Sequence, residues 1–256
     1  MSRVDRALGL ARSLAIYHAI PLRQRRLRRL YGHFVGAGDL VFDIGAHAGN
    51  RVRAFAALGC RVVALEPQPD FAWLLRALFG RSPQIVVVEA AVAARPGRGS
   101  LSLSERTPTV TTLSQDFVDS VQHEPGFTKV KWSRGVRVEV VTLQSLVERY
   151  GEPKFVKVDV EGFEAEVLAG LTTPVRALSF EYVPATRDIA LDCIEQLGVL
   201  AEYRYNWSIG ETHRLCSEHW LDAVGMRTFL IGLAKGAPSG DVYASRIDVS
   251  LPSGSE

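Results

Sequence analysis

The stretch that decides the fold is LVFDIGAHAGNRVRAF, residues 40–55. Its apolar start is typical of a buried strand, and the residues after Asn50 show apolar side chains at helical spacing. Asp43, Gly45 and Gly49 lie between the two patterns. Asn50 is expected to cap the helix, because asparagine is a favoured cap. A strand, a glycine loop and a helix in this order make the first half of a βαβ unit.

The same alternation continues along the chain and predicts an α/β fold built on a parallel sheet. Thr142 is expected to cap one of the helices. We expect further core strands over residues 61–67, 84–93, 154–160 and 175–183, with helices over 69–80, 143–151, 161–170 and 189–197.

The chain divides into three parts by composition. Residues 1–37 predict an arginine-rich arm of two short helices separated at Pro21, and residues 38–237 predict the main domain. Within it, residues 93–135 lose the regular pattern and are expected to form an insertion or loop. Residues 238–256 are rich in Gly, Ser and Asp and are expected to be a flexible tail. The arm has a run of arginines that predicts either a solvated helix face or a contact with an anionic substrate or membrane surface, namely Arg23, Arg25, Arg26, Arg28 and Arg29.

Composition excludes several classes of protein. The chain has 256 residues, of which 47% are hydrophobic and 23% charged, as in one globular domain with a large core. A net charge of +2 argues against a nucleic-acid partner for the whole protein. Cys60, Cys193 and Cys216 lack the spacing of a zinc site or a disulfide framework. The sequence shows neither a secretion signal nor a membrane-spanning segment, so we expect a soluble cytoplasmic protein.

The loop after the first strand indicates the type of cofactor. Glycines allow close approach of a ligand, and a helix start offers free N–H groups to an anion. Asp43, however, would repel a pyrophosphate, and the dinucleotide pattern G-x-G-x-x-G is absent. S-adenosylmethionine carries an ammonium, a sulfonium and one carboxylate, and therefore suits both features. Glu66 lies seventeen residues after Gly49 at the end of the second strand, where it can accept both ribose hydroxyls of an adenosine.

Five segments of residues 38–183 carry a resemblance to a known family. In order, they are VFDIGAHAGN, VVALEPQPD, VTLQSL, FVKVDVEGFEAEVLAG and LSFEY. They resemble the FkbM-type family of S-adenosylmethionine-dependent methyltransferases. The resemblance implies the Rossmann-like class I methyltransferase fold, with seven strands that are parallel except for the last and helices on both faces. The predicted cofactor-binding residues are Asp43, Gly45, His47, Gly49, Asn50, Glu66, Pro67, Glu89, Ala90, Ala91 and Asp159.

Four carboxylates are candidates for catalysis. Asp159 and Glu181 end the fourth and fifth core strands, and a carboxylate after a buried strand needs a partner or a ligand. Glu161 and Glu164 lie at a helix start, where capping is the alternative role. One of them would take the proton of an acceptor hydroxyl. Asp159, Glu161 and Glu181 also have the oxygen ligands of a metal site, but we predict none because no fourth ligand is evident.

The histidines and tryptophans have less specific roles. His47 lies in the glycine loop, where packing or a backbone hydrogen bond is expected and proton transfer is the alternative. His213 is expected to be an exposed loop residue unless it reaches the site. Trp207 and Trp220 are expected to be core or edge aromatics rather than a substrate platform.

The sequence therefore predicts a methyltransferase that uses S-adenosylmethionine and a hydroxyl acceptor on a sugar, glycan or secondary-metabolite small molecule. Nitrogen acceptors and a homo-oligomeric state are left open. Two alternatives remain at this point: a NAD-dependent oxidoreductase, and a non-catalytic nucleotide-binding module that acts through its arginine arm.

Overall fold

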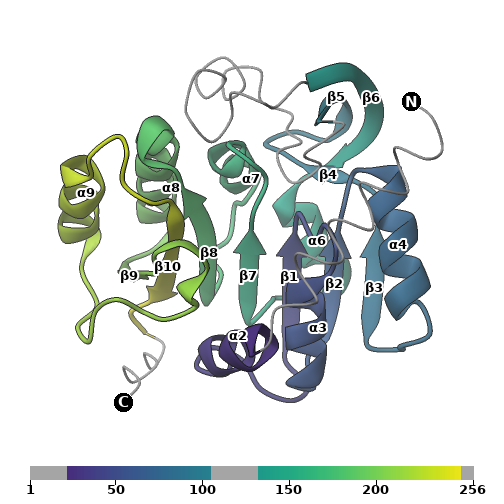
Figure 1. Ribbon diagram of the computed structural model, residues 1–256, viewed down its shortest axis with the longest axis horizontal. Coiled ribbons are helices and arrows are strands. Elements are labelled where there is room, and N and C mark those ends of the chain that lie inside the picture. Colours follow the sequence, from purple (N-terminus) through teal and green to yellow (C-terminus); the bar gives the residue numbers. More distant parts are fainter. Residues whose placement is uncertain (1–21, 105–131, 249–256) are drawn as a thin grey trace.

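The computed structural model describes residues 22–104 and 132–248. Its centre is a seven-stranded sheet with the strand order β3-β2-β1-β7-β8-β10-β9 (Figure 1). Strand β10 runs antiparallel to both of its neighbours, and the other pairs are parallel. The strands are β1 (Leu40–Ile44), β2 (Arg61–Leu65), β3 (Ile85–Val88), β7 (Phe155–Val158), β8 (Ala177–Tyr182), β9 (Tyr203–Trp207) and β10 (Gly240–Arg246). The expected fold class is confirmed.

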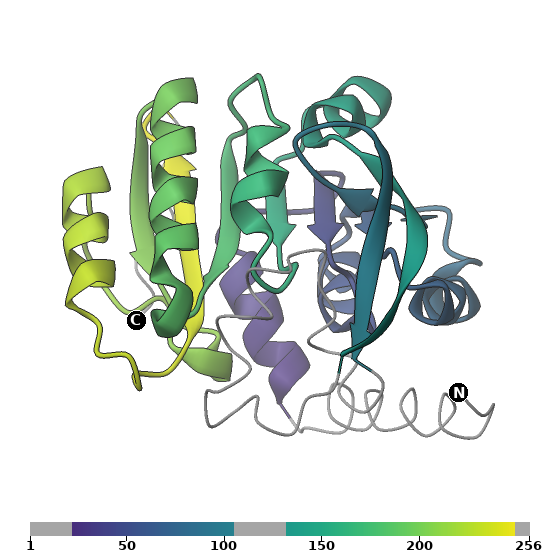
Figure 2. The same cartoon turned by 90° about the horizontal axis from the view of Figure 1, so that it is seen from above.

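Helices cover both faces of this sheet (Figures 1 and 2). The apolar cluster on one face contains residues of α6 (Leu143–Tyr150), α7 (Glu164–Ala169), α8 (Arg187–Leu200) and α9 (Ala223–Gly232). The cluster on the other face contains residues of α2 (Arg23–Tyr31), α3 (Asn50–Ala57) and α4 (Pro69–Phe79). Two short 3-10 turns follow strands at the edge that holds the site, η2 (Pro184–Thr186) and η3 (Gly210–Thr212). Within the described ranges, no helix has the length and apolar character needed to cross a membrane.

A second, three-stranded sheet lies beside the first. It consists of β4 (Ala91–Val92), β6 (Trp132–Val141) and β5 (Gly97–Ser104), in that order. The single strand expected over residues 84–93 is therefore wrong, because the chain leaves the main sheet after Val88 and pairs again with β6 from Ala91. Strands β5 and β6 also occupy the two ends of the irregular segment 93–135. Its middle, residues 105–131, lies outside the described residues.

Two other expectations need correction. The prediction of a flexible tail is wrong for residues 240–246, because they form β10 and pair with both β8 and β9. Asn50 is not the cap of α3 but its first residue, and Gly49 precedes it with a left-handed φ of 76°. Thr142 caps α6 as expected, its hydroxyl accepting a hydrogen bond from the Ser145 N–H at 3.1 Å. The first expected helix of the arm lies outside the described residues.

Candidate functional site

The two loop glycines are required by close packing. Gly45 has a φ of 82°, and a Cβ there would lie 1.9 Å from the backbone oxygen of Asp159. A Cβ on Gly49 would lie 2.5 Å from the Phe79 ring and 2.8 Å from Leu75 of α4. These glycines therefore allow close approach to the loop after β7 and to α4, and their role in binding a ligand stays a prediction. The Gly45 contact places the end of β1 next to the loop after β7.

Asp43 lies in β1 and is fully buried. Neither of its carboxylate oxygens makes a hydrogen bond of standard geometry with the described residues. Burial raises the pKa of Asp43 to about 6, although the nearby charges of Arg51 and Lys157 and the Val52 N–H act to lower it. A buried carboxylate with so few hydrogen bonds is costly, and a ligand with a positive charge or N–H donors would satisfy it.

Glu66 follows β2 and connects two loops of the site. Its Oε2 accepts a hydrogen bond from the His47 N–H at 2.8 Å, and its Oε1 accepts one from the Gln68 N–H at 2.9 Å. Burial raises the pKa of Glu66 to about 7, and the charge of Asp43 adds to this effect. Each oxygen keeps a lone pair for a further donor, as two ribose hydroxyls would require.

The other predicted cofactor residues are spread around these two acids. His47 has a φ of 45°, and its ring lies against Phe71 with the ring centroids 4.0 Å apart. Burial lowers the pKa of His47 to about 4, which fits a packing role for a neutral ring. Asn50 is buried, and its Nδ2 has no hydrogen-bond partner among the described residues. Pro67 is half-buried and continues the chain from Glu66.

The predicted cofactor residues Glu89, Ala90 and Ala91 follow β3. Ala90 and Ala91 are buried, as the wall of a ring pocket would be. Glu89 instead points to the surface, where its Oε2 pairs with Arg76 of α4 at 2.6 Å. Its side chain therefore serves a surface ion pair, and its backbone is the part that is near the buried alanines.

Asp159 follows β7 and is held by two cations. Its Oδ2 lies 3.1 Å from Nη2 of Arg51 and 3.5 Å from Nζ of Lys157. Arg51 comes from the start of α3, so this ion pair links the glycine loop to the end of β7. Sequence reasoning included Asp159 but missed Arg51, although an arginine directly after the glycine loop was visible in the motif.

Lys157 and Asp241 form a buried ion pair that sequence reasoning also missed. Nζ of Lys157 lies 2.8 Å from Oδ1 of Asp241 in β10 and donates to the Val158 carbonyl at 3.0 Å. Burial alone would lower the pKa of Lys157, but the charges of Asp159 and Asp241 outweigh it and raise that pKa. Burial would raise the pKa of Asp241, but the charges of Lys157 and Arg51 lower it below its usual value. A lysine inside the apolar strand sequence FVKVDV was the available signal.

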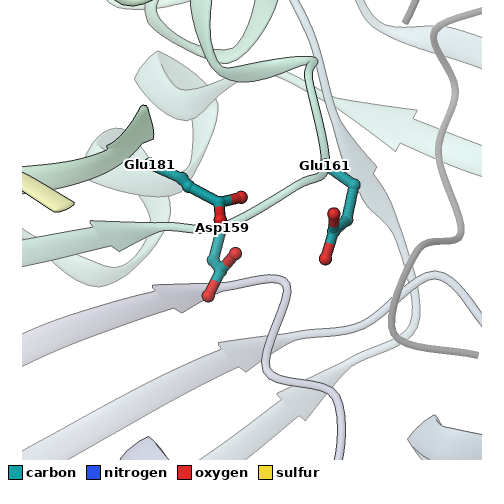
Figure 3. A group of neighbouring side chains, drawn as sticks. All are labelled: Asp159, Glu161 and Glu181. Carbon is teal, nitrogen blue, oxygen red and sulfur yellow. The ribbon is translucent and has the colours of Figure 1, made fainter. Parts of the chain in front are cut away.

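Asp159, Glu161 and Glu181 come together at this edge of the sheet (Figure 3). One ligand atom from each lies within 4.8 Å of the others. Glu161 sits in the loop after β7 with a φ of 53°, and Glu181 is part of β8. Burial raises the pKa of both glutamates well above the usual range, and the neighbouring carboxylates raise each further. The three predicted carboxylates thus form one acidic cluster.

Glu164 is also close to this cluster but has a structural role. It is the first residue of α7, and its Oε1 accepts hydrogen bonds from the N–H groups of Val160 at 3.1 Å and Gly162 at 3.3 Å. It is buried, and burial raises its pKa to about 7. Glu164 and Glu181 line the same small cavity, of about 10 Å³. Glu164 therefore holds the loop that carries Glu161.

His213 is not the exposed residue that was expected. It is buried, and its Nε2 lies 3.0 Å from Oε2 of Glu211 in η3. The same oxygen of Glu211 pairs with Arg23, the buried first residue of α2. Burial would raise the pKa of Glu211, but the hydrogen bond from His213 and the charges of Arg51 and Arg23 lower it strongly. These ion pairs join the start of α2 to η3, at the edge of the sheet that carries the site.

The two tryptophans pack as core and edge aromatics. Trp207 of β9 lies against Phe229 of α9 with ring centroids 4.3 Å apart. Trp220 meets Phe34 at 6.2 Å in an edge-on contact. Neither contact involves the acidic cluster.

Comparison with known proteins identifies the chain's relatives. The model of the family described as "Methyltransferase FkbM domain" matches residues 43–203. Hexuronic acid methyltransferase AglP of Haloferax volcanii is 29% identical over 147 residues, which are 57% of this chain and 55% of the relative. The chain thus spans about half the length of the curated relative it matches.

Two solved structures have a similar arrangement. An O-methyltransferase from Bacillus cereus in complex with SAH gives a TM-score of 0.46 at 12% identity, over 96% of this chain and 92% of the other. A TehB-like SAM-dependent methyltransferase from Corynebacterium glutamicum gives 0.44 at 12% identity, over 92% of this chain and 93% of the other. The fold assignment itself rests on the strand order described above.

Proposed function

Because the chain belongs to the FkbM methyltransferase family, we propose that it transfers a methyl group from S-adenosylmethionine to a hydroxyl of a sugar, glycan or related small molecule. The observation that carries the proposal is the pair of buried acids at the ends of neighbouring parallel strands, Asp43 and Glu66. Parallel α/β sheets bind their ligands at this edge.

The residues of the first two loops fit S-adenosylmethionine. Asp43 has two carboxylate oxygens without standard hydrogen bonds, and the Nδ2 of Asn50 has no partner in the described part of the chain. Asp43 would face the ammonium group, and Asn50 would donate to a carboxylate oxygen. Glu66 would accept the ribose hydroxyls while its backbone contacts hold it in place. The cofactor, when bound, supplies an electrophilic methyl group.

The acidic cluster supplies the candidate base. The Oδ2 atom of Asp159 is already engaged by Arg51 and Lys157, so this residue is better suited to position its neighbours than to accept a proton. Glu181 and Glu161 have raised pKa values. Neither of them forms an ion pair with a cation among the described residues, so their carboxylate oxygens stay available to an acceptor hydroxyl, and we assign the proton transfer to Glu181 with Glu161 beside it.

The sugar acceptor is supported by the named activity of the relative, a hexuronic acid methyltransferase. Hydroxyl methylation also agrees with a carboxylate cluster, since a hydroxyl must lose a proton as the new bond forms. We place the reaction in the cytoplasm because Cys60, Cys193 and Cys216 are free thiols, as a reducing compartment keeps them.

The oxidoreductase alternative is disfavoured by Asp43, which would face a pyrophosphate at the same loop. The non-catalytic alternative is disfavoured by the intact acids of the first two strands and by a cluster of carboxylates with raised pKa values, which are frequent at catalytic sites.

The test is an incubation of the purified protein with methyl-labelled S-adenosylmethionine and either glucuronate glycosides or a metabolite extract, followed by mass spectrometry. We expect label on an oxygen of a sugar product. Glu181→Gln should abolish the transfer and keep cofactor binding, whereas Glu195→Gln on the exposed side of α8 should leave both unchanged. Binding of NAD without any binding of S-adenosylhomocysteine would overturn the proposal.

A further inference from the structure

A concave groove lies between α2 and the loop after η3. It has a volume of about 320 Å³, and Arg26, Arg29 and His33 line it on one side. His213 and Arg214 line the other side, together with Leu215. Residues three and four apart share one side of a helix, so α2 presents both of its groove arginines in the same direction.

The positive charge of this groove has no carboxylate partner in the part of the chain that the structure describes. None of the described lining residues is acidic. Within residues 22–104 and 132–248, Arg26, Arg29 and Arg214 form no ion pair, and all three are exposed. Three arginines therefore line one space without an ion-pair partner among the described residues. Guanidinium forks bind phosphate oxygens in pairs, which makes arginine the usual residue for this task.

The volume of the groove and the positions of its arginines favour a small anionic ligand over a membrane surface. Its volume of about 320 Å³ is at the lower end of the range for small-molecule pockets, roughly 300–1,000 Å³. A membrane surface would use the outermost arginines of α2 as well, including Arg25 and Arg28, which are exposed but do not line the groove. Three arginines also exceed the charge of a single carboxylate, whereas a phosphate or diphosphate group balances them.

The start of α2 contacts the predicted cofactor loop, because Nε2 of Gln24 donates a hydrogen bond to the Asn50 carbonyl at 3.0 Å. His213 of the groove wall pairs with Glu211 at 3.0 Å, and Glu211 pairs with Arg23 at the start of α2. The charge of Arg51, which binds Asp159, also acts on Glu211. A ligand that extends from this end of α2 along the helix would reach Arg26 and Arg29.

We propose that this groove binds a phosphate or diphosphate group of a small ligand, through Arg26, Arg29 and Arg214. We assign that group to the acceptor, and this assignment alone rests on the proposed methyltransferase function. The acceptor class is then a phosphorylated sugar or a sugar linked through a diphosphate.

The first experiment measures binding of inorganic pyrophosphate by titration calorimetry at low salt. Arg26→Gln/Arg29→Gln should weaken binding about tenfold or more, because two charge-assisted contacts are lost. The matched control is Arg25→Gln/Arg28→Gln, which removes the same charge from the same helix outside the groove and should change affinity less than about twofold. Both variants should keep the wild-type thermal unfolding curve and the wild-type affinity for S-adenosylhomocysteine.

Three results would overturn the groove proposal. These are equal loss of pyrophosphate binding in the two double variants, tighter binding of glucuronate than of pyrophosphate, and absence of pyrophosphate binding to the wild type. Sedimentation with phosphatidylglycerol vesicles that both variants weaken equally would assign the arginines to a membrane surface instead.

A second experiment tests the acceptor assignment. Products labelled by the wild type in a metabolite extract should lose mass on phosphatase or pyrophosphatase treatment, and the groove variant should label them less. Labelled products without phosphate would overturn the acceptor assignment. Failure of the proposed function would be recognised separately, as a wild type that binds pyrophosphate but not S-adenosylhomocysteine.

Discussion

Glu66 should make cofactor binding depend on pH between about 6 and 8. Its carboxyl is buried, with a pKa raised to about 7 in the cofactor-free protein. Only the ionised form has enough acceptor sites for two backbone N–H groups and two ribose hydroxyls, because a protonated carboxyl uses one oxygen as a donor. Binding to the protein at lower pH must therefore remove this proton first.

The size of the effect follows from the titration. At pH 6 about one-tenth of Glu66 is ionised, and at pH 8 about nine-tenths, so the dissociation constant for S-adenosylhomocysteine should fall about tenfold over this range. Titration calorimetry at half-unit steps of pH would measure it. Two other groups near the cofactor loop titrate at lower pH: Asp43 has a pKa of about 6 and His47 a pKa of about 4. Their protonation should change the dissociation constant mainly below about pH 6.

Glu66→Gln isolates the contribution of this residue. The variant should bind S-adenosylhomocysteine about tenfold or more weakly at pH 8, because contacts to a charged acceptor are lost. The slope between pH 6 and 8 should disappear. Glu195→Gln, which removes an exposed carboxylate, should keep both the affinity and the slope. A wild-type affinity that is flat from pH 6 to 8, or a Glu66→Gln variant that keeps the slope, would refute the reasoning.

The Glu66 carboxyl should also make the free energy of unfolding depend on pH. A salt-bridged acid, whose folded pKa is lowered, loses its stabilising contribution as pH falls, whereas Glu66 loses its contribution as pH rises. Its folded pKa of about 7 exceeds the unfolded value of about 4.3. Its stabilising contribution is therefore complete below about pH 4 and is lost as pH rises through about 7. The free energy of unfolding of the cofactor-free protein should fall by up to about 4 kcal/mol from this source, and Glu66→Gln should remove that fall.

Two further variants test the frame of the site. Asp241→Asn should lower the free energy of unfolding at pH 7 by about 3 kcal/mol, measured by urea titration, because the buried Lys157 keeps only its longer contact with Asp159. The control is Asp192→Asn, at an exposed position of α8, which should cost under about 0.5 kcal/mol in the same titration. Equal unfolding curves for the two would show that the buried pair contributes nothing. Gly45→Ala should abolish S-adenosylhomocysteine binding or folding, because its Cβ would lie 1.9 Å from the backbone oxygen of Asp159. Gly36→Ala adds its Cβ to open space and should change neither the binding of S-adenosylhomocysteine nor the unfolding curve.

The first half of the sheet could be predicted from sequence because its signals are local. Each strand there is a short apolar run, and each is followed by a helix with its own start and stop residues. The positions of Asp43 and Glu66 followed from this pattern, since both acids come at the ends of parallel strands. Local patterns thus indicated both the fold class and the cofactor side of the site.

The second half could not be predicted in the same way because it depends on long-range pairing. Strand β10 has turn-forming residues around it and resembles a tail in sequence, yet it fits between β8 and β9. The tail prediction concealed Asp241, and without Asp241 the partner of Lys157 could not be recognised. The arginine run of α2 left a solvated face and a contact with an anionic substrate or membrane as alternatives in sequence, because the opposite wall of the groove comes from a loop nearly two hundred residues later.

The register of the central strands also explains how charge is divided within the acidic cluster. Strand pairing puts Asp43 beside Lys157, and Asp241 beside Glu181. Lys157 is close enough to neutralise Asp241, and together with Arg51 it also neutralises Asp159. Glu161 and Glu181 form no such ion pair in the described residues, and their pKa values are raised first by burial and then by the neighbouring carboxylates. Under the proposed function, the two carboxylates of the cluster that the sheet does not place next to a buried cation, Glu161 and Glu181, are the ones left to take a proton from the acceptor.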